Sequence, residues 1–293
     1  MKCRCGKEAI IYLRPYRLSL CNSCFVDFYE RKVRRFIRKW RLVEPGETVY
    51  VAVSGGKDSA ACLAVLQQLS VELGIDVAAI HINLGITGYS EKVEDACRRL
   101  CRMLDIPLEV VNLVDAYGVG VEELARSTRR SACSVCGVVK RYLMNRVPRE
   151  LGANRVATGH NLDDVVEFFF KNWTSGNYFW ISKQKPLLPS THPKVLPKIK
   201  PLFERSGLEN EMYVKARGLP YEADECPHAV TSRWGEIAEL VEERAPGFKL
   251  AFARGLEEIK IVAPEPQFTQ CSVCGEPSSG DPCAFCRILR AAA

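Results

Sequence analysis

One stretch combines glycines, a lysine and an aspartate in the pattern of a phosphate-binding loop. The apolar run 49–53 leads into Ser54-Gly55-Gly56-Lys57-Asp58-Ser59, and helix-forming residues follow. A loop between a buried strand and a helix N-terminus presents backbone N–H groups and a positive helix end to an anion. The lysine adds a charge, the serines add hydroxyl donors, and the aspartate is a candidate Mg²⁺ ligand. This stretch therefore predicts a nucleotide site.

Two other interpretations of the stretch fit less well. A Walker A loop needs Gly where Val51 stands, and it needs Ser or Thr where Asp58 follows the lysine. An ordinary strand-to-helix turn would use Gly55 and Gly56 only to relieve backbone strain, which leaves the Lys57-Asp58 pair without a role.

The chain carries fourteen cysteines, and eight of them form two groups of four, one near each end of the chain. The groups are Cys3, Cys5, Cys21 and Cys24, and Cys271, Cys274, Cys283 and Cys286. Four thiolates at such spacing close a tetrahedral structural zinc site, so two Zn²⁺ are expected. The pair Cys3-x-Cys5 is one residue shorter than the usual Cys-x₂-Cys, and reduced thiols in a frayed terminus are the alternative there.

A third set of cysteines lies in the middle of the chain. Cys133-Ser-Val-Cys136 is one pair short of a zinc site and could instead be a redox dithiol, and Cys226 stands in Glu-Cys-Pro-His. If the fold brings Cys226 beside the pair, three thiolates could hold a [4Fe-4S] cluster with one iron open. The cysteines at 62, 97 and 101 sit in helical patterns and are expected in the core.

The elements that must position these residues alternate between strands and helices. Strands are predicted at 76–83, 108–113 and 154–158, and an amphipathic helix at 91–104. This alternation predicts an α/β fold with a parallel sheet and helices on both faces, which binds ligands at the carboxyl ends of its strands.

Three loops, 54–59, 83–88 and 159–164, should converge at that edge of the sheet. Asn161 or Asp163 would there contact Mg²⁺ or nucleotide, or simply cap the following helix. His81 and His192 have no partners at metal-ligand spacing and are expected to be structural.

Residues 25–42 predict a helix with an apolar stripe at Val33, Phe36, Ile37 and Trp40. Its other face carries Arg31, Lys32, Arg34, Arg35, Arg38, Lys39 and Arg41. Such a face either contacts a phosphate backbone or is merely solvated.

Further helix is predicted over 206–245. Its expected buried positions are Met212, Val214, Leu219, Ile237, Leu240 and Val241. A proline-containing linker is predicted at 262–268.

Composition limits the class of protein. The 293 residues are 47% hydrophobic and 26% charged, with a net charge of +6, which is typical of a globular protein. No stretch approaches a membrane span and the N-terminus lacks a signal-peptide core, so we expect a cytoplasmic protein without membrane contact. In that setting, clustered cysteines favour metal sites over disulfides.

Together these motifs resemble the ATP pyrophosphatases (PP-loop proteins), and within them the two-zinc-finger tRNA 2-thiouridine synthetases. The matching stretches are 54–59, His81-Ile-Asn-Leu-Gly-Ile-Thr-Gly-Tyr89, Cys133-Ser-Val-Cys136-Gly-Val-Val-Lys140-Arg141-Tyr142, Thr158-Gly-His-Asn-Leu-Asp-Asp164, Glu225-Cys226-Pro227 and 277–286. The resemblance covers nearly the whole chain. It implies an N-terminal zinc module (1–30), a catalytic domain (31–205), a helical extension that completes it (206–262) and a C-terminal zinc ribbon (263–293).

The resemblance also implies a reaction: adenylation of a tRNA uridine 2-carbonyl by ATP, followed by attack of sulfide held on a cluster at Cys133, Cys136 and Cys226. Asp58 and Asp163 would serve Mg²⁺ or proton transfer, and Lys140 would neutralise developing charge. The implied ATP contacts are Ala52, Val53, Ser54, Gly55, Gly56, Lys57, Ser59, His81, Ile82, Gly159 and Asp164. The implied partners are tRNA and a ubiquitin-like sulfur carrier, and a homodimer is one candidate assembly.

The sequence is compatible with several alternatives. The target uridine lies in the T-loop or at the wobble position, and the closer resemblance is to the T-loop enzymes. Other ATP pyrophosphatases, such as a tRNA lysidine synthetase or an amidating ligase, do not need the three central cysteines. A zinc-ribbon RNA-binding protein without catalysis would leave Lys57 and Asp58 idle. A persulfide relay through the same cysteines competes with the cluster.

Overall fold

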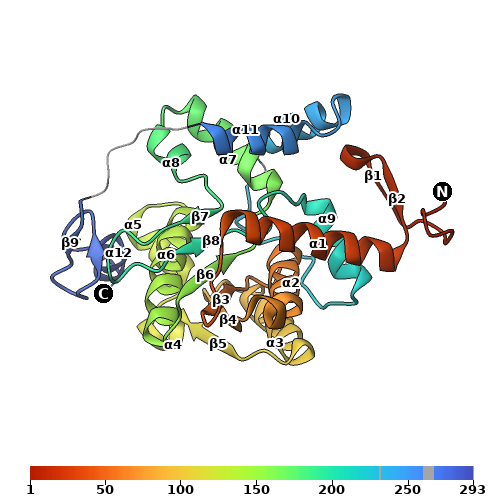
Figure 1. Cartoon of the computed structure of the whole chain (residues 1–293). Helices are drawn as coiled ribbons and strands as arrows, with labels where there is room; N and C mark the ends of the chain where they lie inside the picture. The colour runs from red at the N-terminus through yellow and green to blue at the C-terminus, as the bar shows by residue number, and fades with distance from the viewer. Residues whose placement is uncertain (231, 260–266, 293) are drawn as a thin grey trace.

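A six-stranded sheet in the order β5-β4-β3-β6-β8-β7 forms the centre of the computed structural model (Figure 1). Its strands are β3 (Thr48–Ala52), β4 (Asp76–Asn83), β5 (Leu108–Asn112), β6 (Arg155–Thr158), β7 (Leu187–Leu188) and β8 (Lys198–Ile199). Neighbouring strands are parallel except β7 and β8 at one edge. The structure describes residues 1–230, 232–259 and 267–292. The predicted α/β class with a parallel sheet is confirmed.

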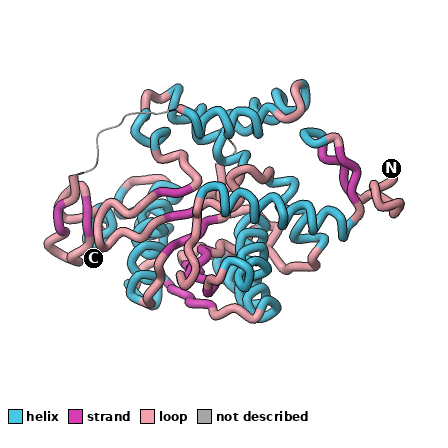
Figure 2. Tube along the Cα trace, in the orientation of Figure 1, coloured by secondary structure: helices cyan, strands magenta, loops and turns pink. Residues whose placement is uncertain are grey.

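Helices flank this sheet on both sides (Figure 2). They are α1 (Asn22–Trp40), α2 (Lys57–Leu73), α3 (Ser90–Leu104), α4 (Leu113–Tyr117), α5 (Val121–Thr128), α6 (Ala132–Glu150), α7 (Leu162–Thr174), α8 (Tyr178–Ser182), α9 (Gly207–Ala216), α10 (Arg233–Arg244), α11 (Phe248–Glu258) and α12 (Ala284–Arg290). One apolar core joins α1, α2 and α9 to the sheet, and a second joins α5, α6 and α12 to it. Because both faces are covered, β4 is buried along most of its length.

The chain order places a switch point between β3 and β6. From β3 the chain moves outward to β4 and β5, and it then returns to β6 on the other side of β3. Ala52 at the end of β3 pairs with Thr158 at the end of β6, so the loops that follow these two strands leave side by side. Such a switch point is where open α/β sheets bind their ligands.

The helix predicted over 206–245 is wrong in its middle. α9 ends at Ala216 and α10 begins at Arg233, and the residues between them that the structure describes form no helix. Gly218 adopts a left-handed φ of 62°, and Pro220 and Pro227 lack the N–H that a continuing helix needs. This segment instead crosses the phosphate loop, where Glu222 N donates to Gly55 O at 2.8 Å.

The burial predicted for α10 is also wrong in part. Ile237 and Leu240 are exposed, and Ala238 is the residue of this helix that is buried. α10 lies against α7, and a small residue at that contact allows a close approach. By contrast, Val214 and Leu219 are buried as predicted.

The small modules at the two ends of the chain each contain a two-stranded antiparallel sheet. β1 (Ile11–Leu13) and β2 (Leu18–Leu20), joined by a 3₁₀ turn at Arg14–Tyr16, precede α1, while β9 (Thr269–Gln270) and β10 (Pro277–Ser278) precede α12. The termini lie at opposite ends of the molecule (Figure 1). Most of the predicted linker, residues 262–266, lies outside the described residues. Within the described ranges, no helix is long and apolar enough to cross a membrane.

Candidate functional site

The phosphate loop has the predicted strand–loop–helix geometry. Gly56 is the N-cap of α2, so the backbone N–H groups of 57–59 begin that helix. The Ser59 hydroxyl accepts a bond from Ser54 N (3.0 Å) and donates to Gly56 O (2.9 Å). Gly55 has φ 88°, and a Cβ there would lie 2.6 Å from the Cβ of Val93. Only glycine fits at this position, and Ser59 closes the loop.

The loop after β6 packs directly against the start of α2. A Cβ on Gly159 would lie 2.8 Å from the backbone carbon of Asp58, so glycine permits this contact. Asn161 caps α7, and its side chain accepts bonds from the backbone N–H groups of Asp163 and Asp164. Asp164 completes a capping box by accepting a bond from Asn161 N. Helix capping, one of the two roles left open for Asn161, is therefore the one that the structure shows.

A chain of hydrogen bonds links the phosphate loop to α1. Lys57 Nζ lies 2.8 Å from Asp58 Oδ2, and Asp58 Oδ1 accepts a bond from Asn210 Nδ2 at 2.8 Å. Asn210 Oδ1 in turn accepts a bond from the buried Tyr29 hydroxyl at 2.6 Å. Desolvation disfavours the charge of Lys57, but Asp58, Asp163 and Glu211 outweigh it and raise the pKa of the lysine. Lys57 is thus held charged at the helix N-terminus.

Asp163 is held by two groups that the sequence did not reveal. Its Oδ1 lies 2.8 Å from Nζ of the buried Lys249 in α11, and its Oδ2 accepts a bond from Gly207 N at 2.7 Å. Lys249 also pairs with Glu239 of α10. No motif surrounds Lys249, so only the tertiary structure reveals this contact. Each oxygen of Asp58 and Asp163 has one partner, and because a carboxylate oxygen can accept a second ligand, both residues can still bind Mg²⁺.

His81 is buried at the carboxyl half of β4 beside the phosphate loop. Its Nδ1 lies 2.9 Å from Val53 O, and because a carbonyl only accepts, Nδ1 carries the proton. Its Nε2 is buried and has no hydrogen-bond partner among the described residues. Burial lowers the pKa of this imidazole. A neutral ring therefore offers one unused acceptor next to the loop.

A basic set, missed by the sequence reasoning, lies at the end of β8. Lys198 pairs with Val156 of β6, so Lys200, two residues on, follows next to the end of that strand. Burial lowers the pKa of Lys200 to about 8. The side chain of Asp164 is accessible, but the surrounding protein desolvates its charge and raises its pKa to about 6. In the sequence, the only sign of this basic set is the absence of acidic residues around Lys198 and Lys200.

The structure brings the three central cysteines to one place. Cys133 and Cys136 lie in the first turn of α6, and Cys133 Sγ donates to His228 O at 2.9 Å. The His228 ring lies 2.8 Å from Glu122 Oε1, which fastens the Cys226 segment to α5. Burial raises the pKa of Cys136, and the positive charge of Lys140 partly offsets this rise. The thiols of Cys226 and Cys133 raise the pKa of Cys136 further.

The spacing of these three sulfur atoms differs from that of the terminal groups. In the described part of the chain, only the terminal groups place all their sulfur atoms within 4.8 Å of one another. Such a tight group suits a single ion, whereas a multi-iron cluster needs a wider set of ligands.

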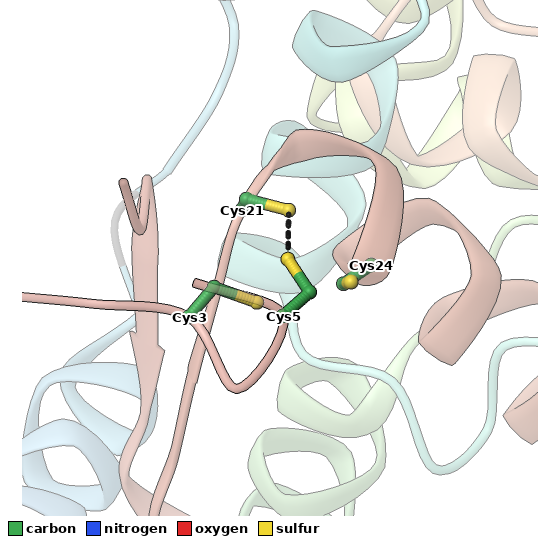
Figure 3. Close-up of side chains that lie close together, drawn as sticks. All are labelled: Cys3, Cys5, Cys21 and Cys24. Atoms are coloured by element: carbon green, nitrogen blue, oxygen red, sulfur yellow. Dashed lines mark hydrogen bonds between the residues drawn. The ribbon is translucent and has the colours of Figure 1, made fainter. Parts of the chain in front are cut away.

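The N-terminal cysteines converge despite the short Cys3-x-Cys5 pair. Figure 3 shows their four side chains pointing toward one another, and Cys5 Sγ lies 3.6 Å from Cys21 Sγ. A backbone donor lowers the pKa of Cys21 to about 6, while bonds with the Cys5 and Cys21 thiols raise the pKa of Cys24. A thiolate is the form that binds zinc, so this geometry fits a metal site.

The C-terminal cysteines form the second tight group. Cys274 Sγ lies 3.8 Å from Cys283 Sγ, and Cys283 N donates to Cys271 Sγ at 3.2 Å. Burial raises the pKa of Cys271, but backbone donors outweigh it and lower the value to about 6. Arg149 of α6 fixes this module to the rest of the molecule, because it forms a bidentate pair with Glu276 at 2.6 and 2.8 Å.

The predicted basic helix is confirmed as α1, but several of its cations are neutralised. Glu72 of α2 pairs with Arg34 and Arg38, and Glu257 of α11 pairs with Lys39. Among the described residues, Arg31, Arg35 and Arg41 have no carboxylate partner. Val33, Phe36 and Ile37 are buried as predicted.

Comparisons with known proteins agree with this geometry. A PP-loop domain model matches residues 27–231. The tRNA-5-methyluridine(54) 2-sulfurtransferases of Pyrococcus horikoshii and Thermus thermophilus are each 40% identical over 98% of this chain, covering 93% and 91% of their own lengths. The structure of the U34-tRNA thiolase NcsA from Methanococcus maripaludis with its [4Fe-4S] cluster aligns with a TM-score of 0.83. It is 29% identical, and the alignment covers 99% of this chain and 96% of that one.

Proposed function

The chain belongs to the PP-loop family of tRNA 2-thiolation enzymes, and we propose that it replaces the 2-oxygen of a T-loop uridine by sulfur at the expense of ATP. The observation that carries this proposal is the segment 217–230, which contacts the Lys57 loop and also contains Cys226. Glu222 N donates to Gly55 O, and four residues later the same segment reaches Cys226. One segment therefore connects the nucleotide loop to the cysteines.

In the first step, the phosphate loop binds ATP. The backbone N–H groups at the start of α2 and the Lys57 ammonium hold its phosphates. Asp58 and Asp163 are the oxygen ligands available for Mg²⁺. The backbone of Ile82, near the end of β4, suits the adenine, whose amino group is a donor, and the buried His81 supports the neighbouring phosphate loop. The uridine 2-oxygen attacks the α-phosphorus, a new P–O bond forms, and pyrophosphate leaves with the electrons of the broken P–O bond.

In the second step, sulfide attacks C2 of the adenylated uridine, and AMP leaves with the former 2-oxygen. Lys140 lies one helical turn from Cys136, where its charge can stabilise the oxygen as negative charge develops. We propose that Cys133, Cys136 and Cys226 hold a [4Fe-4S] cluster, which when bound supplies an open iron for sulfide. These residues fit it because three thiols meet at one place, Cys133 is exposed, and their spacing exceeds that of the single-ion groups.

The remaining components follow the same proposal. The two terminal four-cysteine groups hold one Zn²⁺ each and serve structure. The family resemblance supports a ubiquitin-like carrier as the sulfur donor, whereas a homodimer and the four-part division at 30, 205 and 262 stay predictions.

A second target has one specific observation in its favour: the aligned NcsA structure is named for thiolation of U34. The T-loop is preferred because the relatives at 40% identity are named for position 54. The two targets separate when anaerobic protein, ATP and sulfide react with unmodified tRNA and nuclease fragments are analysed by mass spectrometry. We expect sulfur in the T-arm fragment, and sulfur only in the anticodon fragment would favour the wobble position.

A further inference from the structure

One segment of the chain has a charge pattern unlike the rest. Phe168–Phe203 contains six lysines and no Asp or Glu, although the chain has 35 acidic residues in 293 and a stretch of this length would hold about four. The segment runs from α7 through α8 to the edge strands β7 and β8. Nothing in its secondary structure requires acidic residues to be excluded, so the pattern points to an anionic partner.

This segment reaches the candidate site. Lys200 follows β8 and lies at the level where β6 gives way to the loop 159–164. Its Nζ contacts Lys183 O at 3.5 Å, which connects the end of α8 to this edge of the sheet. The segment that contains the lysines around α8 therefore extends to the strand ends at which we expect the nucleotide to bind.

Aromatic rings stand exposed in the same segment. Trp173, Tyr178 and Trp180 are 52%, 52% and 46% exposed. Trp173 stacks on Phe169 with ring centroids 5.5 Å apart, and its other neighbour, Tyr178, meets it edge to face at 5.5 Å. Trp173 and Tyr178 are thus held by ring contacts while part of their surface faces solvent.

In the part of the chain that the structure describes, the cations beside these rings have no acidic partners. Among the described residues, no carboxylate pairs with Lys171, Lys185 or Lys198, whereas Lys194 of the same segment is used to bind Gly275 O at 2.8 Å. Lys171 precedes Trp173 by two residues, and Lys185 follows Trp180 by five. Along the chain, lysines therefore stand before and after the group of rings on α7 and α8.

We propose that this surface, Trp173, Tyr178 and Trp180 with Lys171 and Lys185, binds unpaired nucleotides of the tRNA that flank the reacting uridine. Single-stranded RNA is held by stacking of bases on aromatic rings and by cations along the phosphates, and this surface supplies both. An acidic protein would pair with the lysines but would not require exposed tryptophan faces. The inference rests on the proposed tRNA substrate, and it adds the place on the protein at which the nucleotides around the reacting uridine bind.

The test compares tRNA binding by three pairs of substitutions in the full-length, metal-loaded protein over a range of salt concentrations. Trp173→Ala with Trp180→Ala should weaken binding about tenfold or more while the salt dependence stays constant. Lys171→Gln with Lys185→Gln should reduce the slope of log K against log salt by about one for each lysine. Ile237→Ala with Leu240→Ala, which changes exposed apolar residues on α10, is the matched control and should bind like the wild type.

A spectroscopic measurement separates stacking from a general loss of structure. In protein with Trp40→Phe and Trp234→Phe, the remaining two tryptophans are those of the surface. Added tRNA should quench their fluorescence, and unchanged emission at saturating tRNA would overturn the stacking. If the protein with both tryptophans replaced by Ala fails to fold, Trp180→Glu on α8 and the lysine pair test instead whether this surface binds tRNA, and both should weaken binding.

The outcomes distinguish this inference from the proposed function. If wild-type protein does not bind tRNA, the proposed function fails. If it binds tRNA and the tryptophan and lysine pairs bind equally well, only this surface is wrong. If those pairs keep tRNA affinity but no longer bind a ubiquitin-like carrier, the surface belongs to a protein partner and the inference is overturned.

Discussion

Lys57 and Ser59 stand two residues apart in the phosphate loop and have different roles. The Ser59 hydroxyl bonds to two backbone groups of the loop and fixes its shape. The Lys57 ammonium is partly exposed, and among the described residues it bonds only to the neighbouring Asp58. Ser59 therefore supports folding of the loop, and the lysine charge is available to ATP.

Replacing Lys57 with Ala should abolish most activity and leave the fold intact. A charge aimed at the transferred phosphate contributes about a hundredfold or more to the rate. We expect ATP-dependent thiolation to fall by at least that factor with an unchanged melting temperature. Lys92→Ala removes a comparable exposed pair with Asp224 and is the control. Normal turnover by Lys57→Ala would remove the nucleotide site from this account.

The hydrogen bonds among Tyr29, Asn210 and Asp58 should contribute to the stability of the fold. Asn210→Ala leaves the buried Tyr29 hydroxyl without its acceptor and should lower the free energy of unfolding by about 1–3 kcal/mol. Asn22→Ala, at an exposed and longer bond of 3.4 Å, should change it little. Urea denaturation of zinc-loaded protein measures both. Equal stabilities would mean that this link between α1 and the loop carries no energy.

At the scale of elements, periodicity and turn chemistry predict most of the sheet. The strand predicted at 76–83 is β4 to the residue, and the phosphate loop lies between a strand and a helix as predicted. The segment between α9 and α10 was missed because its conformation depends on the loop that it crosses. Local apolar spacing also cannot show that Ile237 and Leu240 lie on the exposed side of α10.

The tertiary structure sharpens the prediction for the basic helix α1. Arg31→Gln with Arg35→Gln removes unpaired cations and should reduce the salt slope of tRNA binding by about two. Arg34→Gln with Arg38→Gln changes arginines already paired with Glu72, so a smaller reduction is expected. If both pairs bind tRNA like the wild type, α1 is a solvated face.

The terminal modules should depend on metal for their structure. Metal analysis is expected to find about two zinc per chain. Cys274→Ser should lose one zinc and give unstable protein, because binding energy at such sites is folding energy. Cys101→Ala, in the core of α3, is the control and should keep both. One zinc in the wild type with Cys3 and Cys5 open to alkylation would confine the metal to the C-terminal module.

At the scale of the whole molecule, the site is assembled from segments far apart in the chain. α2, the loop after β6, the segment 217–230 and Lys249 of α11 meet at the switch point of the sheet. The sequence identifies the first two by their motifs, and it identifies Cys226 by its residue type. It cannot reveal Lys249, whose contact only the folded chain creates, and it signals the basic edge at β8 only through the absence of acidic residues around the lysines.

The central claim, that uridine is activated by adenylation before sulfur enters, is tested most directly by following its oxygen. A synthetic T-arm RNA with ¹⁸O at the 2-position of the target uridine is reacted anaerobically with protein, ATP and sulfide. We expect one labelled AMP for each thiouridine, since AMP leaves with the former 2-oxygen. Mass spectrometry of the AMP and of the RNA gives both quantities. Thiouridine formed together with unlabelled AMP would contradict the account.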